Sequence, residues 1–262
     1  MKRRGFGCLL AAVCLLLAGE GFAQIADLNG AINKAGRQRM LSQRMAKAYF
    51  QIGQQVEGER SRKILDASVA LFDRQLVELK NYAPTPGIKD IYLRLEKTWI
   101  AYKDALLGAA PAQANGRRVL DLSEQTLALA QEGTQQLEKF SGTTAGHLVN
   151  LAGRQRMLSQ RMAKFYQALA WNVADPASAA SLDKARREFA EAQQELRGAP
   201  ANTQQIGEAL DLVTQQWFFF DNALSQKPGA DKHHAVAVAT TSERILEEME
   251  GVVSLYEKLS VK

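Results

Sequence analysis

The sequence predicts an all-α protein built from two tandem antiparallel four-helix bundles that are related by internal duplication. Apolar residues recur with helical spacing along nearly the whole chain, whereas glycine and proline gather at short joints. The thirteen residues AGRQRMLSQRMAK at 35–47 also recur without a change at 152–164. Each copy has roughly 115 residues, an ordinary size for one four-helix bundle with its own core.

The first 23 residues have the features of a cleavable export signal. Residues 2–4 are basic, residues 8–17 form an apolar stretch too short to span a membrane comfortably, and residues 21–23 provide a small-residue cleavage site. We therefore expect residues 1–23 to be a signal peptide and the mature protein to begin at Gln24 in the periplasm. The alternative is an uncleaved segment that anchors the protein to the membrane.

Composition excludes several classes of function. Both cysteines, Cys8 and Cys14, lie within the expected signal, so the mature chain has no disulfide, thiolate nucleophile or cysteine metal ligand. Removing residues 1–23 leaves 30 basic and 27 acidic residues, which is only mildly basic. No basic stripe is interleaved with aromatic residues, and we therefore expect no nucleic-acid partner.

Helical periodicity and its interruptions place four helices in each copy. In the first module, 24–141, the pattern predicts helices at about 25–57, 59–82, 88–109 and 115–140, with a joint over 83–87. In the second module, 142–262, it predicts helices at about 144–173, 176–197, 203–226 and 231–260, with joints at 198–200 and 228–229.

The repeat extends well past its identical block. Phe72 corresponds to Phe189, and Trp99 corresponds to Trp217 after one inserted residue. Further along, Glu138-Lys139 corresponds to Glu257-Lys258 after a second insertion, so a whole module was copied. We expect Trp99 and the aromatic run 217–220 to be core residues, with the alternative that part of the run seals the contact between the copies.

The connection at 141–143 is short, and it allows two arrangements of the modules. They can stack end to end on a long shared helix, or fold back so that the two motif helices lie in contact. We favour the fold-back arrangement because it alone explains why both copies keep every motif residue. One chain would then be the counterpart of a homodimer, although a true homodimer remains an alternative.

The repeated segment carries three arginines and no acidic residue, and its apolar, polar and small residues face several directions. A helix that packs on several sides holds at least one arginine away from water, and such a charge needs a carboxylate or an external anion. For Arg37 and Arg44 we expect carboxylates of the same module, such as Asp73, Glu78 or Glu96.

The motif resembles the signature of PilJ-type sensor domains, the periplasmic input modules of type IV pilus chemotaxis transducers, which are related to NarX-type nitrate/nitrite sensor kinases. The resemblance rests on Asn33, Ala35, Gly36, Arg37, Gln38, Arg39, Met40, Leu41, Ser42, Gln43 and Arg44. The second copy repeats it at Asn150, Ala152, Gly153, Arg154, Gln155, Arg156, Met157, Leu158, Ser159, Gln160 and Arg161. The resemblance implies an antiparallel four-helix bundle with the motif on its first helix.

In nitrate-sensing members of that family, the arginine one residue before the methionine binds the anion where two motif helices meet. The resemblance therefore implies this role for Arg39 and Arg156. A guanidinium presents donors in a fixed fork that suits a planar oxyanion. Two such groups about 6 Å apart repel by roughly 3 kcal/mol at an effective dielectric constant of about 20, and a monoanion between them turns repulsion into attraction.

Other motif residues have supporting roles in this hypothesis. Gly36 and Gly153 leave space for the partner helix or the ligand, and four side chains are candidate neutral donors: Ser42, Gln43, Ser159 and Gln160. We expect the remaining motif residues to be structural: Asn33, Asn150, Arg37, Arg154, Arg44 and Arg161. The alternative for Arg39 and Arg156 is a buried ion pair that fixes helix register.

No catalytic or metal-binding constellation is present, and we expect neither an enzyme nor a bound cofactor. The motif methionines are expected to be core residues. His147, at the entry to the second motif helix, is either a solvated cap or a secondary donor to the site.

The sequence thus predicts a periplasmic sensor module for a small anion such as nitrate or nitrite. The chain ends at Lys262 directly after the second bundle, so we expect a separate membrane receptor, kinase or transporter to read the bound state. The alternative is a helical interaction or structural protein in which the duplicated motif is an assembly surface.

Overall fold

The computed structural model describes residues 25–229 and 232–259, and the expected export signal therefore lies outside the described residues. Within these residues the chain forms eight α-helices and no strand. The helices are α1 (Leu28–Gln54), α2 (Gly58–Tyr82), α3 (Pro86–Leu107), α4 (Gln113–Ser141), α5 (Thr144–Ala170), α6 (Ser178–Arg197), α7 (Gln204–Ser225) and α8 (His233–Glu257).

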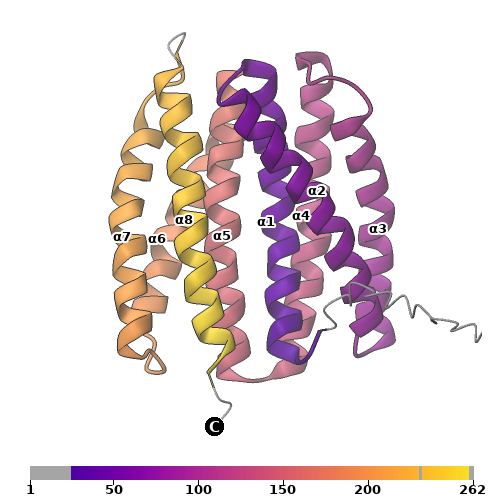
Figure 1. Cartoon of the computed structure of the whole chain (residues 1–262), viewed down its shortest axis with the longest axis vertical. Helices are drawn as coiled ribbons and strands as arrows, with labels where there is room; N and C mark the ends of the chain where they lie inside the picture. The colour runs from indigo at the N-terminus through magenta and orange to yellow at the C-terminus, as the bar shows by residue number, and fades with distance from the viewer. Residues whose placement is uncertain (1–24, 230–231, 260–262) are drawn as a thin grey trace, which may run out of the picture.

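The helices form two antiparallel four-helix bundles, α1–α4 and α5–α8, as the sequence predicts. In each bundle the motif helix packs against the second and fourth helices, and the third helix packs mainly against the fourth. Helices α1 and α5 run side by side in the same direction at the centre of the molecule (Figure 1). The fold-back arrangement is therefore confirmed, and the modules do not stack end to end.

The helix boundaries follow local capping chemistry. Asp27 and Thr143 accept hydrogen bonds from the amides of Gly30 and Gly146, at 2.7 and 3.0 Å, at the starts of α1 and α5. Helix α3 begins at Pro86, inside the joint that we expected over 83–87. Proline suits the first position of a helix because the N–H that it lacks there would have no partner within the helix.

Each bundle has its own aromatic core. Phe72 and Trp99 pack with ring centroids 4.2 Å apart, and Phe189 and Trp217 repeat this contact at 4.4 Å. The alternative that part of the 217–220 run seals the contact between the copies is wrong. Helix α7 lies at the outer edge of the molecule, far from α1 (Figure 1). The expectation that the whole run is core is also wrong for Phe218 and Phe219, which are 69% and 57% exposed.

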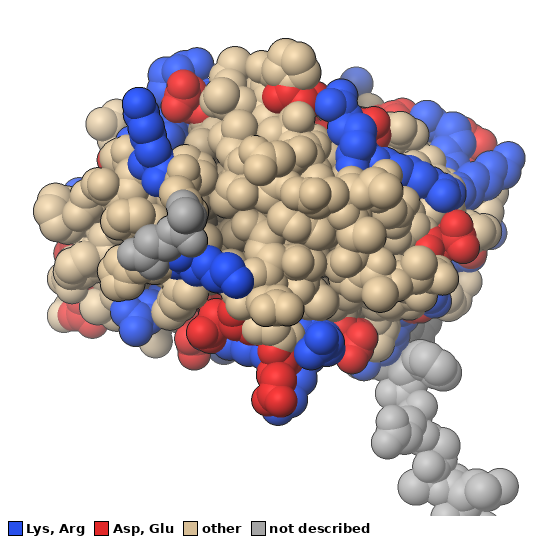
Figure 2. Space-filling view, turned by 90° about the horizontal axis from the view of Figure 1, so that it is seen from above, with Lys and Arg blue, Asp and Glu red and all other residues tan. Residues whose placement is uncertain are grey.

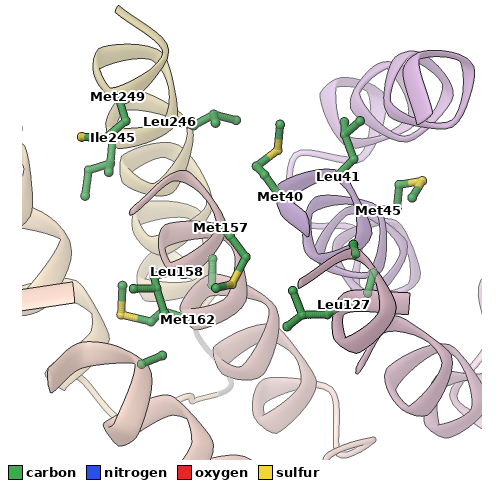
Figure 3. Close-up of a cluster of buried hydrophobic side chains, with 14 of the residues drawn as sticks. Met40, Leu41, Met45, Leu127, Met157, Leu158, Met162, Ile245, Leu246 and Met249 are labelled. Carbon is green, nitrogen blue, oxygen red and sulfur yellow. The ribbon is translucent and has the colours of Figure 1, made fainter. Parts of the chain in front are cut away.

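A separate apolar layer joins the two bundles. Met40 of α1 and Leu246 of α8 point toward each other across the module boundary, as do Met157 of α5 and Leu127 of α4 (Figure 3). All four side chains are buried. Since the same contact is made in both directions, the two modules share one continuous core, and the motif helices run through its middle.

At one end of the molecule, charged side chains lie mainly around the rim (Figure 2). Figure 2 views the end that carries the α1–α2 and α5–α6 connections, and its centre shows few charged groups.

Of the helices in the described ranges, none combines the length and the apolar character that a membrane span requires.

Candidate functional site: the paired motif helices

Two glutamines of the motif attach α1 and α5 to other helices of their own bundle. Gln38 donates to the carbonyl of Phe72 on α2 at 3.3 Å, and Gln155 donates to that of Phe189 on α6 at 3.0 Å. Both amide side chains are fully buried. These contacts explain part of the identity between the copies, because a buried carbonyl that loses its donor is costly.

All four candidate neutral donors form hydrogen bonds within their own bundle. Ser42 donates to the carbonyl of Arg39 at 2.7 Å, and Gln43 donates to the carbonyl of Ser123 on α4 at 3.0 Å. In the second copy Ser159 and Gln160 do the same, toward the carbonyls of Arg156 and Ser242. The structure therefore does not bring these donors to the space between Arg39 and Arg156.

The outer arginines of α1 pair across the module boundary. Arg37 donates to Glu250 of α8 through Nε and Nη2, at 3.1 and 2.7 Å, and Arg44 pairs with Glu243 of the same helix. The prediction of partners in the same module is wrong for both. Asp73, Glu78 and Glu96 pair instead with lysines of their own bundle. The fold-back arrangement, which brings α8 beside α1, is the reason.

The outer arginines of α5 follow this pattern only in part. Arg161 pairs with Glu124 of the first bundle at 2.6 Å, which mirrors Arg44 and Glu243. Arg154, by contrast, pairs with Glu188 of its own bundle at 3.0 Å. Leu71 occupies the place of Glu188 in the first copy, so Arg37 has no such partner.

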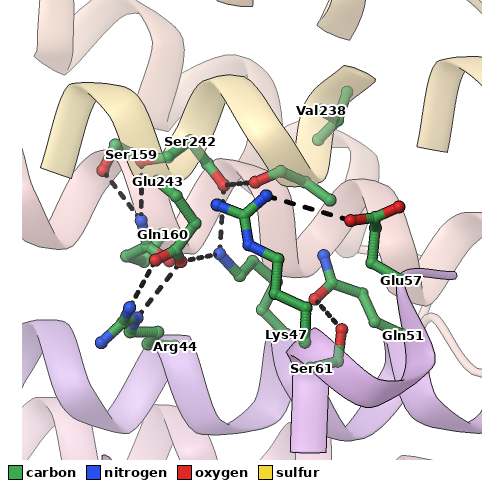
Figure 4. Close-up of polar contacts among 12 residues, drawn as sticks. Arg44, Lys47, Gln51, Glu57, Ser61, Ser159, Gln160, Val238, Ser242 and Glu243 are labelled. Atoms are coloured by element: carbon green, nitrogen blue, oxygen red, sulfur yellow. Dashed lines mark hydrogen bonds and ion pairs between the residues drawn. The ribbon is translucent and has the colours of Figure 1, made fainter. Parts of the chain in front are cut away.

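Two fully buried lysines complete these ion clusters and were not singled out in the sequence. Lys47 pairs with Glu243, and Lys164 pairs with Glu124 at 2.6 Å; Figure 4 shows the first cluster. Burial acts to raise the pKa of Glu243, but Lys47 and Arg44 hold it at about 2. Lys47 and Lys164 both lie in the identical thirteen-residue block, and this recurrence was the sequence signal that could have identified them.

At the opposite end of the motif helices, two asparagines also cross between modules. Asn33 donates to Glu257 of α8 at 2.8 Å, and Asn150 donates to Glu138 of α4. The expected structural role of these asparagines thus takes the form of a reciprocal contact. Between the asparagines and the lysines, the centre of the interface contains Arg39 and Arg156.

The two central arginines are fully buried and lie against the same pair of glycines. A Cβ atom on Gly36 would lie 3.2 Å from Nη2 of Arg39 and 3.5 Å from Nη2 of Arg156. A Cβ atom on Gly153 would lie 3.2 Å from Nη2 of Arg156 and 3.4 Å from Nη2 of Arg39. The structure therefore brings together Gly36, Gly153, Arg39 and Arg156, and a methyl group on either glycine would require a guanidinium group to shift by a few tenths of an ångström.

Arg156 has an anionic partner. Its Nη1 donates to Glu250 at 2.7 Å, and its Nη2 donates to the side-chain oxygen of Asn33 at 2.9 Å. Burial lowers the pKa of Arg156, and Glu250 opposes that effect. Arg156 thus has a carboxylate counter-ion inside the protein, which it shares with Arg37.

Arg39 has only neutral partners. Its Nη1 donates to Oε1 of Gln131 at 2.6 Å, and its Nη2 donates to the backbone carbonyl of Asn150 at 3.2 Å. Burial and then the charge of Arg156 lower the pKa of Arg39 to about 9. A buried cation without a carboxylate is costly, because desolvation is not repaid by an ion pair.

Unused polar atoms lie beside this charge. The Nε atoms of Arg39 and Arg156 are buried and have no acceptor among the described residues, and the side-chain oxygen of Asn150 has no donor. An arginine with a free Nε–H can donate from Nε and Nη2 to two oxygens of one planar anion. The centre of the interface therefore has the donors and the excess positive charge that a small oxyanion requires.

His147 lies at the edge of the motif helix, and its side chain is about half exposed. It contacts Glu138 at 2.6 Å and Glu195 at 3.1 Å, and the hydrogen bond with Glu138 raises its pKa. It is a bridge between three helices and does not contact the arginine pair. In the described part of the chain, no three His, Cys, Asp or Glu side chains gather in a way that could hold a metal ion.

Comparison with protein-family models matches residues 22–126 and 139–240 to one family, PilJ, described as the N-terminal domain of type IV pili methyl-accepting chemotaxis transducers. The two matched segments fall on the two bundles and together cover more than half of the chain. No curated protein and no solved structure gives a match.

Proposed function

Because the chain belongs to the PilJ family of chemotaxis-transducer sensor domains, which are signalling and not catalytic domains, we propose that it is a periplasmic module that binds a small oxyanion such as nitrate or nitrite. The anion binds between α1 and α5, where Arg39 and Arg156 are its cationic ligands. Gly36 and Gly153 leave the space in which the two guanidinium groups lie side by side. A separate membrane receptor, kinase or transporter reads the bound state.

One observation carries this proposal: two fully buried arginines lie together over two glycines, and only one of them has a carboxylate partner. An anion supplies the missing counter-charge and accepts from the unused Nε–H of Arg39. The structural alternative, a buried ion pair that fixes helix register, accounts for Arg156 and Glu250 but leaves the charge of Arg39 unexplained.

Binding at this place couples directly to the packing of the two bundles. The anion attracts both guanidinium groups, and these are fixed to α1 and α5, so the bound state favours a closer approach of the two helices. Small shifts of packed helices are a common output of interface switches. The ends of α1 and α5 then present the change to the partner.

The test is thermal unfolding and calorimetric titration of the purified protein with nitrate, nitrite, chloride and sulfate. At an anion concentration 100 times the Kd, specific binding raises Tm by about 5–10 °C. Arg39→Gln should abolish the shift. Arg154→Gln is the matched control, because Arg154 lies on α5 near the pair but is bound to Glu188, and it should retain the shift. Equal shifts with all four anions, or none, would refute the proposal.

A second candidate function has specific support from the other motif residues. Four other motif residues connect α1 to neighbouring helices: Gln38, Gln43, Arg44 and Lys47. Their copies on α5 do the same. These contacts favour a helical assembly protein in which the motif is a packing surface. Such a protein would bind none of the four anions, and Arg39→Gln would stabilise it, because the substitution removes a buried charge without a carboxylate.

A further inference from the structure

We infer that Glu250 is a built-in counter-ion for Arg156 that makes Arg39 the principal ligand of the oxyanion and selects monovalent over divalent anions. This inference rests on the proposed function and adds to it a residue that determines specificity. Its starting point is a difference between two copies that are otherwise closely matched around the site.

The position of Glu250 in the repeat is well defined. Ser123, Glu124 and Glu138 of α4 correspond to Ser242, Glu243 and Glu257 of α8, and each pair makes the same contacts with the opposite motif helix or its own. With the same spacing, Gln131 corresponds to Glu250. The α4 and α8 sides of the site therefore differ by one charge at one equivalent position.

The two side chains also occupy the same place relative to the arginines. Oε1 of Gln131 lies 2.6 Å from Nη1 of Arg39, and Oε2 of Glu250 lies 2.7 Å from Nη1 of Arg156. Each arginine thus receives one oxygen from the fourth helix of its own bundle. Only the oxygen on the Arg156 side carries a negative charge.

Glu250 is held in place by Arg37 and Arg156, and it is therefore not free to pair with Arg39. Its Oε2 accepts from Arg156 and from Nη2 of Arg37, and its Oε1 accepts from Nε of Arg37. Gln131, the equivalent residue on α4 of the first copy, has no arginine to bind in this way, because Arg154 of α5 pairs with Glu188. The negative charge is therefore fixed to one side of the site.

The charge balance determines which anion fits. Arg156 is already paired with Glu250, so Arg39 is the buried cation that lacks a carboxylate. Arg37, which shares Glu250, is partly exposed to solvent, and water screens its charge. Among the fully buried arginines Arg39 and Arg156 and the carboxylate Glu250, a monoanion beside Arg39 therefore balances the charge. A dianion of similar shape adds a second negative charge in a buried site that already contains Glu250, and this excess is unfavourable at low dielectric.

Two reciprocal substitutions test this inference. Gln131→Glu places a carboxylate on Arg39, and it should raise the Tm of the protein without added anion and weaken nitrate binding about tenfold or more. Glu250→Gln makes the two sides equally neutral, and it should raise the affinity for sulfate relative to nitrate. Gln131→Met is the matched control: it removes the hydrogen bond without adding charge and should retain nitrate binding. All four proteins are titrated with sodium nitrate and sodium sulfate.

The outcomes separate this inference from the function on which it rests. If the unmodified protein binds none of the anions, the proposed function fails and the inference fails with it. If it binds nitrate but Gln131→Glu binds nitrate equally well, only the inference is overturned. If Gln131→Glu does not fold, as judged by circular dichroism, Glu250→Gln decides the question, and an unchanged ratio of sulfate to nitrate affinity refutes the inference.

Discussion

The polar contacts of the motif asparagines and lysines, at the two ends of the α1–α5 interface, are matched between the copies, whereas the contacts at its centre are not. At one end Lys47 pairs with Glu243, and Lys164 pairs with Glu124. At the other end each motif asparagine donates to a glutamate of the opposite bundle. Only at the centre does one copy use Gln131 where the other uses Glu250.

This comparison separates residues that hold the modules together from residues that distinguish them. Contacts that recur in both directions satisfy a packing requirement that the duplication imposed on both copies. A change confined to one copy, at a position that contacts a buried arginine, is not required for packing, because the other copy packs without it. The centre of the interface is therefore where the two halves of the molecule can have different roles.

The largest expected effect concerns the two clusters, Lys47 with Glu243 and Lys164 with Glu124, at one end of the interface. Glu243→Gln leaves the fully buried Lys47 without a carboxylate, and we expect a loss of about 3–5 kcal/mol in the free energy of unfolding. Glu124→Gln should cost less, because the side chain of Glu124 is 33% exposed and that of Glu243 is 11% exposed. Guanidinium denaturation of both variants measures the difference. Equal losses would show that the two lysine clusters are matched in energy as well as in contacts.

Acid should weaken both lysine clusters together. Burial acts to raise the pKa of Glu124, as it does for Glu243, but the paired cations hold both values at about 2. An unfolded glutamate has a pKa of about 4.3, so on acidification the unfolded state takes up protons first. The stabilisation is present above about pH 5 and is lost progressively toward pH 2. Urea titrations at pH 7, 5 and 3 should show this decline, and Glu124→Gln combined with Glu243→Gln should flatten it.

The sequence predicts the fold better than it predicts the ion pairs. Helical periodicity places all eight helices within a few residues of their observed ends, because caps and joints act locally. The partners of Arg37 and Arg44 depend instead on which helices meet after the chain folds back. No local pattern contains that information, and the carboxylates that we expected are in the wrong module.

The residues of the candidate site were likewise predicted only in part from the sequence. The doubled motif identifies Arg39 and Arg156, and the structure does bring them together. The motif does not contain Gln131 or Glu250, which lie on the fourth helix of each bundle and contact the arginines only in the folded molecule. Aligning the fourth helices of the two repeats would have revealed the difference, since Glu138 and Glu257 fix the register.

A second mismatch between the copies lies near the end of the motif helices. A Cβ atom on Gly53 would lie 2.1 Å from Cζ2 of Trp171, which packs against α1 from the second module, whereas the second copy has Ala170 at the position of Gly53. Gly53→Ala should therefore cost about 1–3 kcal/mol through overpacking. The reciprocal Ala170→Gly should cost at most about 1 kcal/mol, as a helix propensity effect. Thermal unfolding followed by tryptophan fluorescence measures both, and equal costs would contradict the packing argument.

The smallest expected effect concerns His147, whose position in the first copy is held by Gly30. The hydrogen bond with Glu138 raises the pKa of His147 above its ordinary value of about 6.5, so the protonated form stabilises the folded state. This contribution is complete below about pH 6.5 and disappears as the pH rises through the raised pKa.

Because the imidazole is about half exposed, His147→Gln should cost only a few tenths of a kcal/mol at pH 6 and nothing at pH 9. Denaturation of the variant and the unmodified protein at both pH values isolates the contribution of protonated His147 to the free energy of unfolding. Gly30→Ala is the matched change in the first copy, and it adds no titratable group, so its effect should be the same at pH 6 and pH 9. A pH-dependent effect of Gly30→Ala would show that another group titrates at this end, and the assignment to His147 would then be wrong.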